Sequence, residues 1–329
     1  MGETFVRRPS SLVVTWSRYF VWNIPCGCGC GKPFEEGGHQ LQCTLQRRSG
    51  EYVRHPLSER VRQLREFADV VESTSFAVDR FLDLVGCCPD IVAHHGSLVG
   101  DYRSANFDVV GAVAENTRNV RAVMERMKVC GARAFVLTGT VFEPGEGVGT
   151  DPGRAFSSYG LSKGITSDIF RWHAREFGVP LAKFVIPNPF GPLEEERFCR
   201  YAYCRWLVGE PAVVRFPEYV RDNIHVDLLA MAYARYVSEA YDGTAVETLG
   251  PSGYVETQGA FALRLAREVG GRLGLKSEIA FASQADFDEP LVRVNPLPAR
   301  HYVDTWCEVR SWERVAAWVV SIRNGSGAR

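Results

Sequence analysis

The sequence lacks several features that would each indicate a particular class of protein. Its formal net charge is −1, so no excess of basic residues predicts binding to nucleic acid. It shows no internal repeat and no low-complexity segment, which argues against a repeat protein. Its ten cysteines have no regular spacing, so they predict reduced thiols in a cytoplasmic protein rather than a disulfide framework.

Long apolar runs are also missing. The nearest approach is the segment 12–26, which is too short to span a bilayer and is interrupted by Arg18 and Asn23. No cleavage site of the small-x-small type follows it, so we expect neither a secretory signal nor a membrane anchor. With 329 residues, the chain can bury a sizeable core.

What the sequence does have is a regular alternation of short apolar runs and amphipathic segments. The expected strands and helices, in chain order, are 90–94, 107–129, 134–137, 157–177 and 181–186. Ser157 or Ser158 would cap the helix at 157–177, and Gly178 would end it. The alternation predicts an α/β fold with a doubly wound parallel sheet of the Rossmann-like type, covered by helices on both faces.

After Pro187 the alternation stops, and the following segment is rich in proline, arginine and aromatic residues. Two more helices are expected downstream, at 258–273 and 311–322, with a strand between them at about residue 279. We therefore divide the chain into a Rossmann-like domain, residues 1–187, and a smaller C-terminal lobe, residues 188–329. Some segments of the lobe are expected to return to the sheet.

Polar residues follow each of the predicted strands. They are His94 to Ser97 after the first, Thr138 to Thr140 after the second, and Asn188 after the third. In a doubly wound sheet the carboxyl ends of the strands meet at one edge, where ligands bind. We therefore expect these groups to converge on one site.

The segment that carries most chemical information is Tyr159 to Lys163 at the start of the helix 157–177. The phenol and the ammonium are four residues apart, so they project from the same helical face. A lysine held near a tyrosine lowers the pKa of the phenol, because positive charge favours the phenolate. Such a tyrosine can transfer a proton to or from an alcohol or a ketone.

Together these segments resemble the extended short-chain dehydrogenase/reductase family, the NAD(P)-dependent epimerase/dehydratase group that acts mainly on nucleotide sugars. The matching segments, in family order, are Asp90 to Ser97, Asn116, Phe135 to Phe142, Tyr159 to Lys163, Ile186 to Pro192 and Tyr219 to Val226. The resemblance is good from residue 69 to 237 and weaker beyond. It implies that residues 1–187 bind a dinucleotide and that the lobe binds the substrate.

The resemblance also implies roles for individual residues. Tyr159 would be the catalytic acid/base, Lys163 would bind the nicotinamide ribose and support the phenolate, and Thr138 would hydrogen-bond the reacting oxygen. The implied substrate-binding residues are Thr140, Asn188 and Arg221. The residues implied to bind NAD or NADP are Lys163, Gly27, Gly29, Gly31, Arg47, His94, Ser97 and Pro187.

Several of these residues also have ordinary structural interpretations. Thr138 can be a strand-end hydroxyl, Asn188 a turn residue before a proline, and Arg221 one half of a surface pair with Asp222. A hydrolase built on His95-Gly96-Ser97 is the alternative from another enzyme class, and it has little support.

One departure from the family narrows the chemistry. The 4,6-dehydratases of the family follow the active hydroxyl with Asp-Glu, whereas Gly139 and Thr140 stand at those positions here. Without that carboxylate pair, elimination of water by the same route is disfavoured. The remaining expectations are 4-epimerisation through a ketone and reduction of a keto-sugar.

A second departure lies at the start of the chain. The family begins with a strand and a Gly-x-x-Gly-x-x-Gly turn that approaches the cofactor pyrophosphate, whereas residues 26–33 read Cys-Gly-Cys-Gly-Cys-Gly-Lys-Pro. Residues 1–36 form either an aberrant but working phosphate loop or a divergent, reading-frame-disturbed replacement that binds dinucleotide poorly. The third alternative is a metal site of Cys26, Cys28, Cys30 and Cys43, which the spacing does not favour, so we expect no metal.

The sequence thus predicts an NAD(P)-dependent epimerase or ketoreductase that acts on a nucleotide sugar. The alternative is a degenerate, non-catalytic relative with impaired dinucleotide binding. Arg47 and Arg48 end the expected second strand, where a basic residue would suit the 2′-phosphate of NADP, but the choice between NAD and NADP stays open. The resemblance further implies a homodimer formed through the helices 107–129 and 157–177.

Overall fold

The central feature of the protein is a seven-stranded sheet in which every neighbouring pair of strands is parallel. The computed structural model describes residues 11–15, 40–100, 104, 106–151 and 153–323. The strands, from one edge of the sheet to the other, are β11 (Thr248–Leu249), β7 (Leu181–Ile186), β5 (Ala134–Thr140), β4 (Ile91–His94), β1 (Ser11–Thr15), β2 (Gln40–Thr44) and β3 (Asp69–Val71). This arrangement confirms the predicted doubly wound, Rossmann-like sheet.

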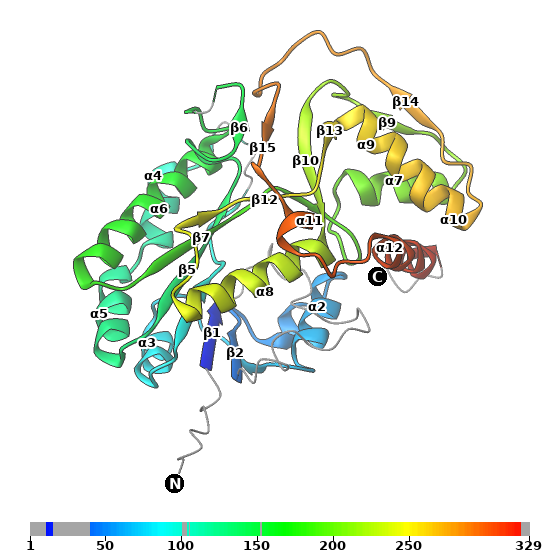
Figure 1. Cartoon of the computed structure of the whole chain (residues 1–329). Helices are drawn as coiled ribbons and strands as arrows, with labels where there is room; N and C mark the ends of the chain where they lie inside the picture. Colours follow the sequence, from blue (N-terminus) through cyan, green and yellow to red (C-terminus); the bar gives the residue numbers. More distant parts are fainter. Residues whose placement is uncertain (1–10, 16–39, 101–103, 105, 152, 324–329) are drawn as a thin grey trace.

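Helices cover both faces of the sheet (Figure 1). Against one face lie α3 (Asp79–Gly86), α4 (Val109–Asn116), α5 (Val120–Cys130) and α6 (Ser158–Phe177), and against the other lie α2 (Leu57–Leu64) and α8 (Val226–Asp242). Successive strand residues alternate between the two cores. Phe135 and Leu137 of β5 pack toward α5 and α6, whereas Val136 packs toward α8.

Of the two long helices predicted near the site, the structure contains one, at 157–177, and divides the other, at 107–129. Ser157 caps α6 by accepting a hydrogen bond from the Gly160 N–H at 3.2 Å, and Gly178 ends it with φ of 67°. The single helix expected at 107–129 is wrong, because the chain breaks between α4 and α5. Asn119 adopts φ of 50° there, and its side chain donates to the Ala77 carbonyl at 3.1 Å.

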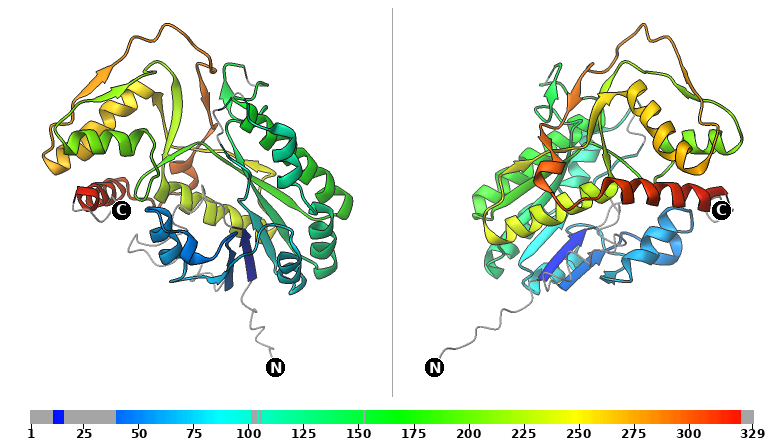
Figure 2. Two further views of the ribbon diagram at one scale, coloured as in Figure 1. Left: turned by 180° about the vertical axis from the view of Figure 1, so that it is seen from behind. Right: turned by 45° about the vertical axis from the view of Figure 1, so that its right-hand side comes forward.

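A smaller lobe is built around a second core of aromatic side chains. Its strands are β8 (Asn188–Phe190), β9 (Ala212–Val214), β10 (Val220–His225), β13 (Tyr254–Thr257) and β14 (Ile279–Phe281). Its helices are α7 (Phe198–Leu207), α9 (Gln258–Leu265), η2 (Ala266–Gly270), α10 (Gly271–Leu273) and α12 (Glu308–Arg323). Figure 2 shows these elements gathered at one side of the sheet domain.

The remaining elements are short. They are η1 (Ser49–Glu51), β6 (Val148–Gly149), β12 (Pro251–Ser252), β15 (Arg293–Val294), β16 (Leu297–Pro298) and α11 (Ala299–Tyr302). From β14 to β15 the chain runs over the top of the molecule in Figure 1, and we call residues 282–292 of this connection the strap. The lobe boundary at 187/188 stays a prediction, although α8 and β11 lie with the sheet.

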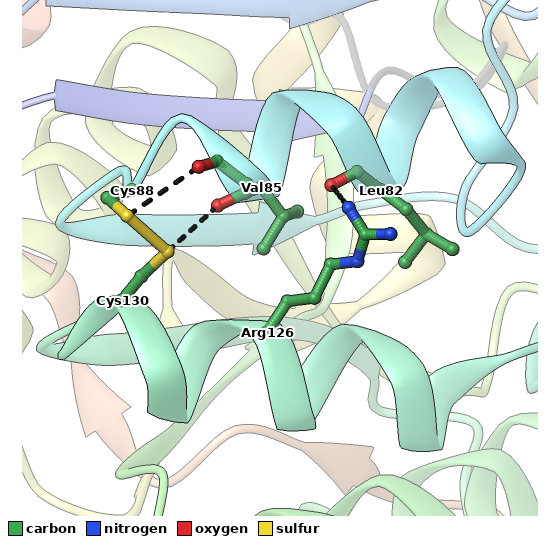
Figure 3. Close-up of a disulfide and its surroundings, with 6 residues drawn as sticks. Leu82, Val85, Cys88, Arg126 and Cys130 are labelled. Atoms are coloured by element: carbon green, nitrogen blue, oxygen red, sulfur yellow. Dashed lines mark hydrogen bonds between the residues drawn. A yellow bond between two sulfur atoms is a disulfide. The ribbon is translucent and has the colours of Figure 1, made fainter.

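The cysteines differ from the expectation of reduced thiols. Cys88 follows α3 and Cys130 ends α5, and the two are joined by a disulfide with a Cα–Cα distance of 4.8 Å (Figure 3). They meet because α3 and α5 pack side by side, with Arg126 of α5 donating to the Leu82 carbonyl at 2.8 Å. The cytoplasmic location derived from cysteine spacing stays a prediction. Within the described ranges, no helix has the length and apolar character needed to cross a membrane.

Candidate functional site

The centre of the sheet is the topological switch point, where β4 and β2 flank β1 on opposite sides. At the carboxyl end of this pair of strands, the Thr15 Oγ1 lies 2.6 Å from the His94 Nδ1 and accepts the His95 N–H at 3.2 Å. The three residues hold the ends of β1 and β4 together. A crevice for a dinucleotide is expected above them, since ligands bind outside the carboxyl ends of such strands.

His94 is a predicted cofactor-binding residue whose side chain is buried in an aromatic cluster. Its ring lies 4.0 Å from that of Phe76 and is stacked on Phe170 at 5.6 Å between centroids. Burial, followed by the charge of Lys163, lowers the pKa of His94 well below its usual value, so the ring is neutral. Its role in cofactor binding stays a prediction.

Lys163 lies on the buried face of α6 and points to the end of β5. Its Nζ donates to the Thr138 carbonyl at 2.7 Å, and the residue is 5% exposed. Burial lowers the pKa of Lys163 to about 8; the nearby Glu143 opposes this shift and Lys183 adds to it. Tyr159 is one turn earlier on the same helix, partly buried, with its ring edge-to-face with Phe107 at 6.2 Å.

Thr138 is held from both sides of the sheet. Its carbonyl accepts from Lys163, while its Oγ1 lies 2.5 Å from the Nδ1 of His95, a buried residue to which the family resemblance assigns no role. The ring of His95 packs against Tyr233 of α8 at 5.0 Å. The structure thus brings Lys163, Thr138 and His95 together at the carboxyl end of β5, and Tyr159 lies one turn before Lys163 on α6.

A buried cluster of charged residues, which no sequence pattern predicts, lies beside this group. The Lys183 Nζ donates to the Glu143 Oε2 at 2.6 Å and to the Glu146 Oε1 at 2.5 Å. The other oxygen of Glu143 accepts the Thr140 N–H at 2.8 Å. A Cβ on Gly139 would lie 2.5 Å from the Lys183 Cε, so glycine at this position leaves room for the lysine.

Arg221 does not face open solvent, as a surface pair with Asp222 would require. The Asp222 carboxylate instead accepts the backbone N–H groups of Gly253 and Asn295, at 2.7 and 3.1 Å. The guanidinium of Arg221 is 5% exposed and lies over the Tyr219 ring at 4.3 Å. It donates to the strap, with 2.8 Å to the Glu289 Oε2 and 3.0 Å to the Pro290 carbonyl.

The remaining predicted residues are spread along the edge of the sheet. Asn188 begins β8 directly after the buried Pro187, and its Nδ2 is buried without a hydrogen-bond partner among the described residues. Such an amide can donate to a bound molecule. Thr140 and Ser97 are partly buried, and Arg47 is exposed after β2. Gly27, Gly29 and Gly31 lie outside the described residues.

Two alternative sites are only partly covered by the described residues, because Cys26, Cys28 and Cys30 of the metal alternative lie outside them. Cys43 of β2 is a core residue whose pKa burial raises to about 12, and no group of three His, Cys, Asp or Glu residues in the described ranges could hold a metal ion. Gly160 to Gly164 has the Gly-x-Ser-x-Gly spacing of a hydrolase elbow. Its Ser162 is fully buried inside α6 and donates to the Tyr159 carbonyl at 2.8 Å, so it is not an exposed nucleophile.

Comparison with known families is decisive for the sequence between β2 and β11. Residues 39–248, more than half of the chain, match the model of the NAD dependent epimerase/dehydratase family. The chain belongs to that family. This confirms the resemblance drawn from the six segments. No curated protein matches the sequence.

Several solved enzyme structures share the fold of this chain. The UDP-glucuronic acid 4-epimerase of Bacillus cereus, solved with UDP-glucuronic acid and NAD, superposes with a TM-score of 0.72 at 14% identity, over 95% of this chain and 99% of that one. The UDP-glucose 4-epimerase of Thermotoga maritima, solved with UDP-glucose, gives 0.67 at 18% identity, over 96% and 99%. WbmH of Bordetella bronchiseptica, solved with NAD+, gives 0.62 at 20%, over 95% and 98%.

The family match begins after the segment in which an epimerase/dehydratase family member has its glycine-rich turn. The strand that precedes this turn is nevertheless in place, since β1 pairs in parallel with β4 from Leu12 opposite Ile91 to Thr15 opposite His94. The matched region contains Tyr159, Lys163 and Thr138. The glycines predicted to bind the cofactor, Gly27, Gly29 and Gly31, lie outside the described residues, so their role stays a prediction.

Proposed function

We propose that the protein is an NAD(P)-dependent epimerase or ketoreductase that acts on a nucleotide sugar, with Tyr159 as the acid/base. The observation that carries this proposal is the position of Lys163 and Tyr159 on successive turns of α6, with the Lys163 ammonium fixed on the Thr138 carbonyl at 2.7 Å. A buried ammonium at this distance from the end of β5 favours a nearby phenolate. Family membership supports the same chemistry.

The residues fit a bound nicotinamide dinucleotide. An ammonium has three donor hydrogens, and the described residues give Lys163 one hydrogen bond, which leaves two for ribose hydroxyls. NAD or NADP, when bound, supplies the hydride acceptor or donor. In the oxidative direction Tyr159 accepts the proton of the sugar hydroxyl, and in the reductive direction it returns it. Thr138 hydrogen-bonds the reacting oxygen, and Lys163 stabilises the phenolate.

The substrate end of the proposal rests on Asn188, Thr140 and Arg221. The buried Nδ2 of Asn188 is suited to a sugar or phosphate oxygen, and the guanidinium of Arg221 is suited to a phosphate. UDP-glucose and UDP-glucuronic acid are the first substrates to test, since they are bound in two structures of the same fold. Gly139 provides no carboxylate at the first position of the dehydratase pair, which favours hydride transfer without elimination of water.

A non-catalytic relative is the second candidate, and two observations favour it. The family match starts only at residue 39, and the Arg221 guanidinium is already paired with the Glu289 carboxylate. In that case the protein keeps the fold and a sugar-nucleotide pocket but binds dinucleotide weakly.

A homodimer through the segments 107–129 and 157–177, which correspond to α4, α5 and α6, completes the proposal. The apolar stripe of α6 faces outward: Leu161 is 41% and Trp172 is 70% exposed, and Val110 of α4 is 79% exposed. Apart from Phe170, the buried face of α6 consists of small and polar residues such as Gly164 and Ser167. Burying the outward stripe against a second copy would remove a large apolar patch from water. Sedimentation of the Trp172→Asp variant, expected to be monomeric, tests this interface.

Calorimetric titration with NAD, NADH, NADP and NADPH tests the function. Micromolar binding of any one of them, followed by turnover of a UDP-sugar, is the expected result for the enzyme. If the folded protein binds none of the four dinucleotides, the proposed enzymatic activity is wrong and the non-catalytic alternative is supported. Binding of UDP in the absence of dinucleotide binding would show that the substrate pocket alone has been kept.

A further inference from the structure

We propose that His95 is a positioning residue that directs the proton of the Thr138 hydroxyl toward the reacting oxygen. The inference rests on the proposed function of Thr138, but the direction of the hydrogen bond between His95 and Thr138 can be measured without any activity. The carrying observation is the 2.5 Å contact between the His95 Nδ1 and the Thr138 Oγ1, in which both residues are buried. A hydrogen bond between buried groups is expensive to leave unmade, so both partners keep it.

The direction of this hydrogen bond decides what Thr138 can do. A threonine hydroxyl has one donor hydrogen and two acceptor lone pairs. If the Thr138 O–H donates to His95, no hydrogen is left for a substrate oxygen. If His95 carries its proton on Nδ1 and donates, the Thr138 O–H stays available. The proposed function therefore requires the Nδ1–H form of a neutral His95.

Other contacts fix the two partners in this arrangement. The backbone of Thr138 is fixed by its pairing with β7 and by the Lys163 ammonium, which donates to its carbonyl at 2.7 Å. The His95 backbone N–H is held by the Thr15 Oγ1 at 3.2 Å, and its ring packs on Tyr233. His95 is thus tied to strand β1 through its backbone and to strand β5 through its ring.

The environment also keeps the histidine uncharged. Burial, with a smaller effect of the Lys163 charge, lowers the pKa of His95 to about 3. A neutral ring has a single N–H, so its tautomer is a choice between Nδ1 and Nε2. A hydroxyl that accepts a hydrogen bond becomes a better donor, because successive hydrogen bonds polarise one another. The chain from His95 through Thr138 to the reacting oxygen therefore strengthens the last bond.

The first test is independent of activity. Nitrogen-15 spectra of the histidine-labelled protein, assigned by comparison with His95→Asn, report which ring nitrogen carries the proton. A protonated Nδ1 at neutral pH is the expected result. A protonated Nε2 with an unprotonated Nδ1 would overturn the proposal, whether or not the protein turns over any substrate.

The second test is a double-mutant cycle of His95→Leu and Thr138→Val, with UDP-glucose or UDP-glucuronic acid, whichever the wild-type protein converts. In wild-type protein, His95→Leu should lower kcat by about tenfold to a hundredfold through loss of one buried hydrogen bond, with KM nearly unchanged. In the Thr138→Val background the same change should cost roughly twofold or less, since its target is gone. Equal losses in both backgrounds would mean a purely structural role and would overturn the proposal.

A conservative variant of His95 distinguishes a role in positioning the Thr138 hydroxyl from a role in packing alone. His95→Asn keeps an N–H donor near the position of Nδ1 and should restore most of the kcat that His95→Leu loses. Thermal melting of both variants monitors folding. An Asn variant as slow as the Leu variant, with equal melting temperatures, would contradict the proposal. If wild-type protein turns over neither UDP-sugar, the proposed function is in doubt and the nitrogen-15 spectrum alone decides the role of His95.

Discussion

The two ends of the candidate site are held in different ways. At the sheet end, Lys163 of α6 donates to the Thr138 carbonyl of β5, 25 residues away, so this contact joins two regular elements. Glu143, in the turn that follows β5, accepts the Thr140 N–H three residues away. At the lobe end, Arg221 is held by Glu289 and Pro290, which are 68 and 69 residues away in the strap. The sheet end is built in by secondary structure, whereas the lobe end depends on an irregular segment that can be rearranged.

This difference predicts that substitutions at the sheet end have large effects on chemistry or stability, and that substitutions at the lobe end have small effects on binding.

Tyr159→Phe should abolish turnover, with kcat lower by about a thousandfold because the acid/base is lost. Dinucleotide binding, measured by calorimetry, should be nearly unchanged, since the ring and its edge-to-face contact with Phe107 remain. Tyr201→Phe in α7 removes a hydroxyl of the lobe and serves as the matched control, with activity retained. Unchanged turnover in Tyr159→Phe would show that Tyr159 is not the acid/base and that the sheet end does not carry the chemistry.

Lys183→Met should lower the free energy of unfolding by about 3 kcal/mol, because the buried Glu143 carboxylate loses its cation. Denaturant unfolding measures this loss. The double variant Lys183→Met/Glu143→Gln is the control and should recover part of the stability, since the uncompensated charge is gone. A single variant as stable as the wild-type protein would mean that the cluster does not hold the end of β5.

The pH dependence of turnover should show the burial of Lys163. Its pKa of about 8 means that the ammonium is charged below this pH and neutral above it, so kcat should fall as pH rises through 8, by about tenfold per pH unit. The same shift predicts that stability rises with pH between about 8 and 10.5, because the unfolded lysine still binds a proton in that window. Lys163→Arg should retain its charge and lose the inflection near pH 8.

Glu289→Gln should raise the affinity for UDP by roughly threefold, because a carboxylate no longer competes with phosphate for Arg221. Calorimetry with UDP measures the change. Asp288→Asn, the same loss of charge one residue earlier in the strap, is the matched control and should bind UDP like the wild-type protein. An equal gain in affinity in both variants would mean that the negative charges of the strap repel UDP in general, and that the Glu289–Arg221 contact has no specific effect.

The sequence predicted most of the sheet end and little of the lobe end, and the reason is physical. Hydrophobic periodicity and a serine cap specify α6 and β7 locally, so Tyr159 and Lys163 could be placed from their spacing. The break at Asn119 could not, because its positive φ depends on the distant Ala77 carbonyl.

Buried polar partners escaped sequence reasoning for a related reason. Lys183 lies in an apolar strand pattern, and its carboxylate partners are 37 and 40 residues away. His95 was noticed as a neighbour of His94, but only the pairing of β4 with β5 brings its ring to Thr138. The N-terminal glycines lie in residues 16–39, so their predicted role stays a prediction.

The path of the chain between β7 and β11 limits how this protein can be rebuilt. The chain leaves the sheet at Ile186, forms β8 to β10, and then returns as α8 and β11, which pairs with β7 through Thr248 opposite Lys183. A chimera joined at the single position 187 would therefore lose β11, which is an edge strand, and α8, which covers one face of the sheet. Exchange of the substrate lobe with that of another family member requires junctions on both sides of residues 226–249, so the lobe is a set of insertions rather than a detachable module.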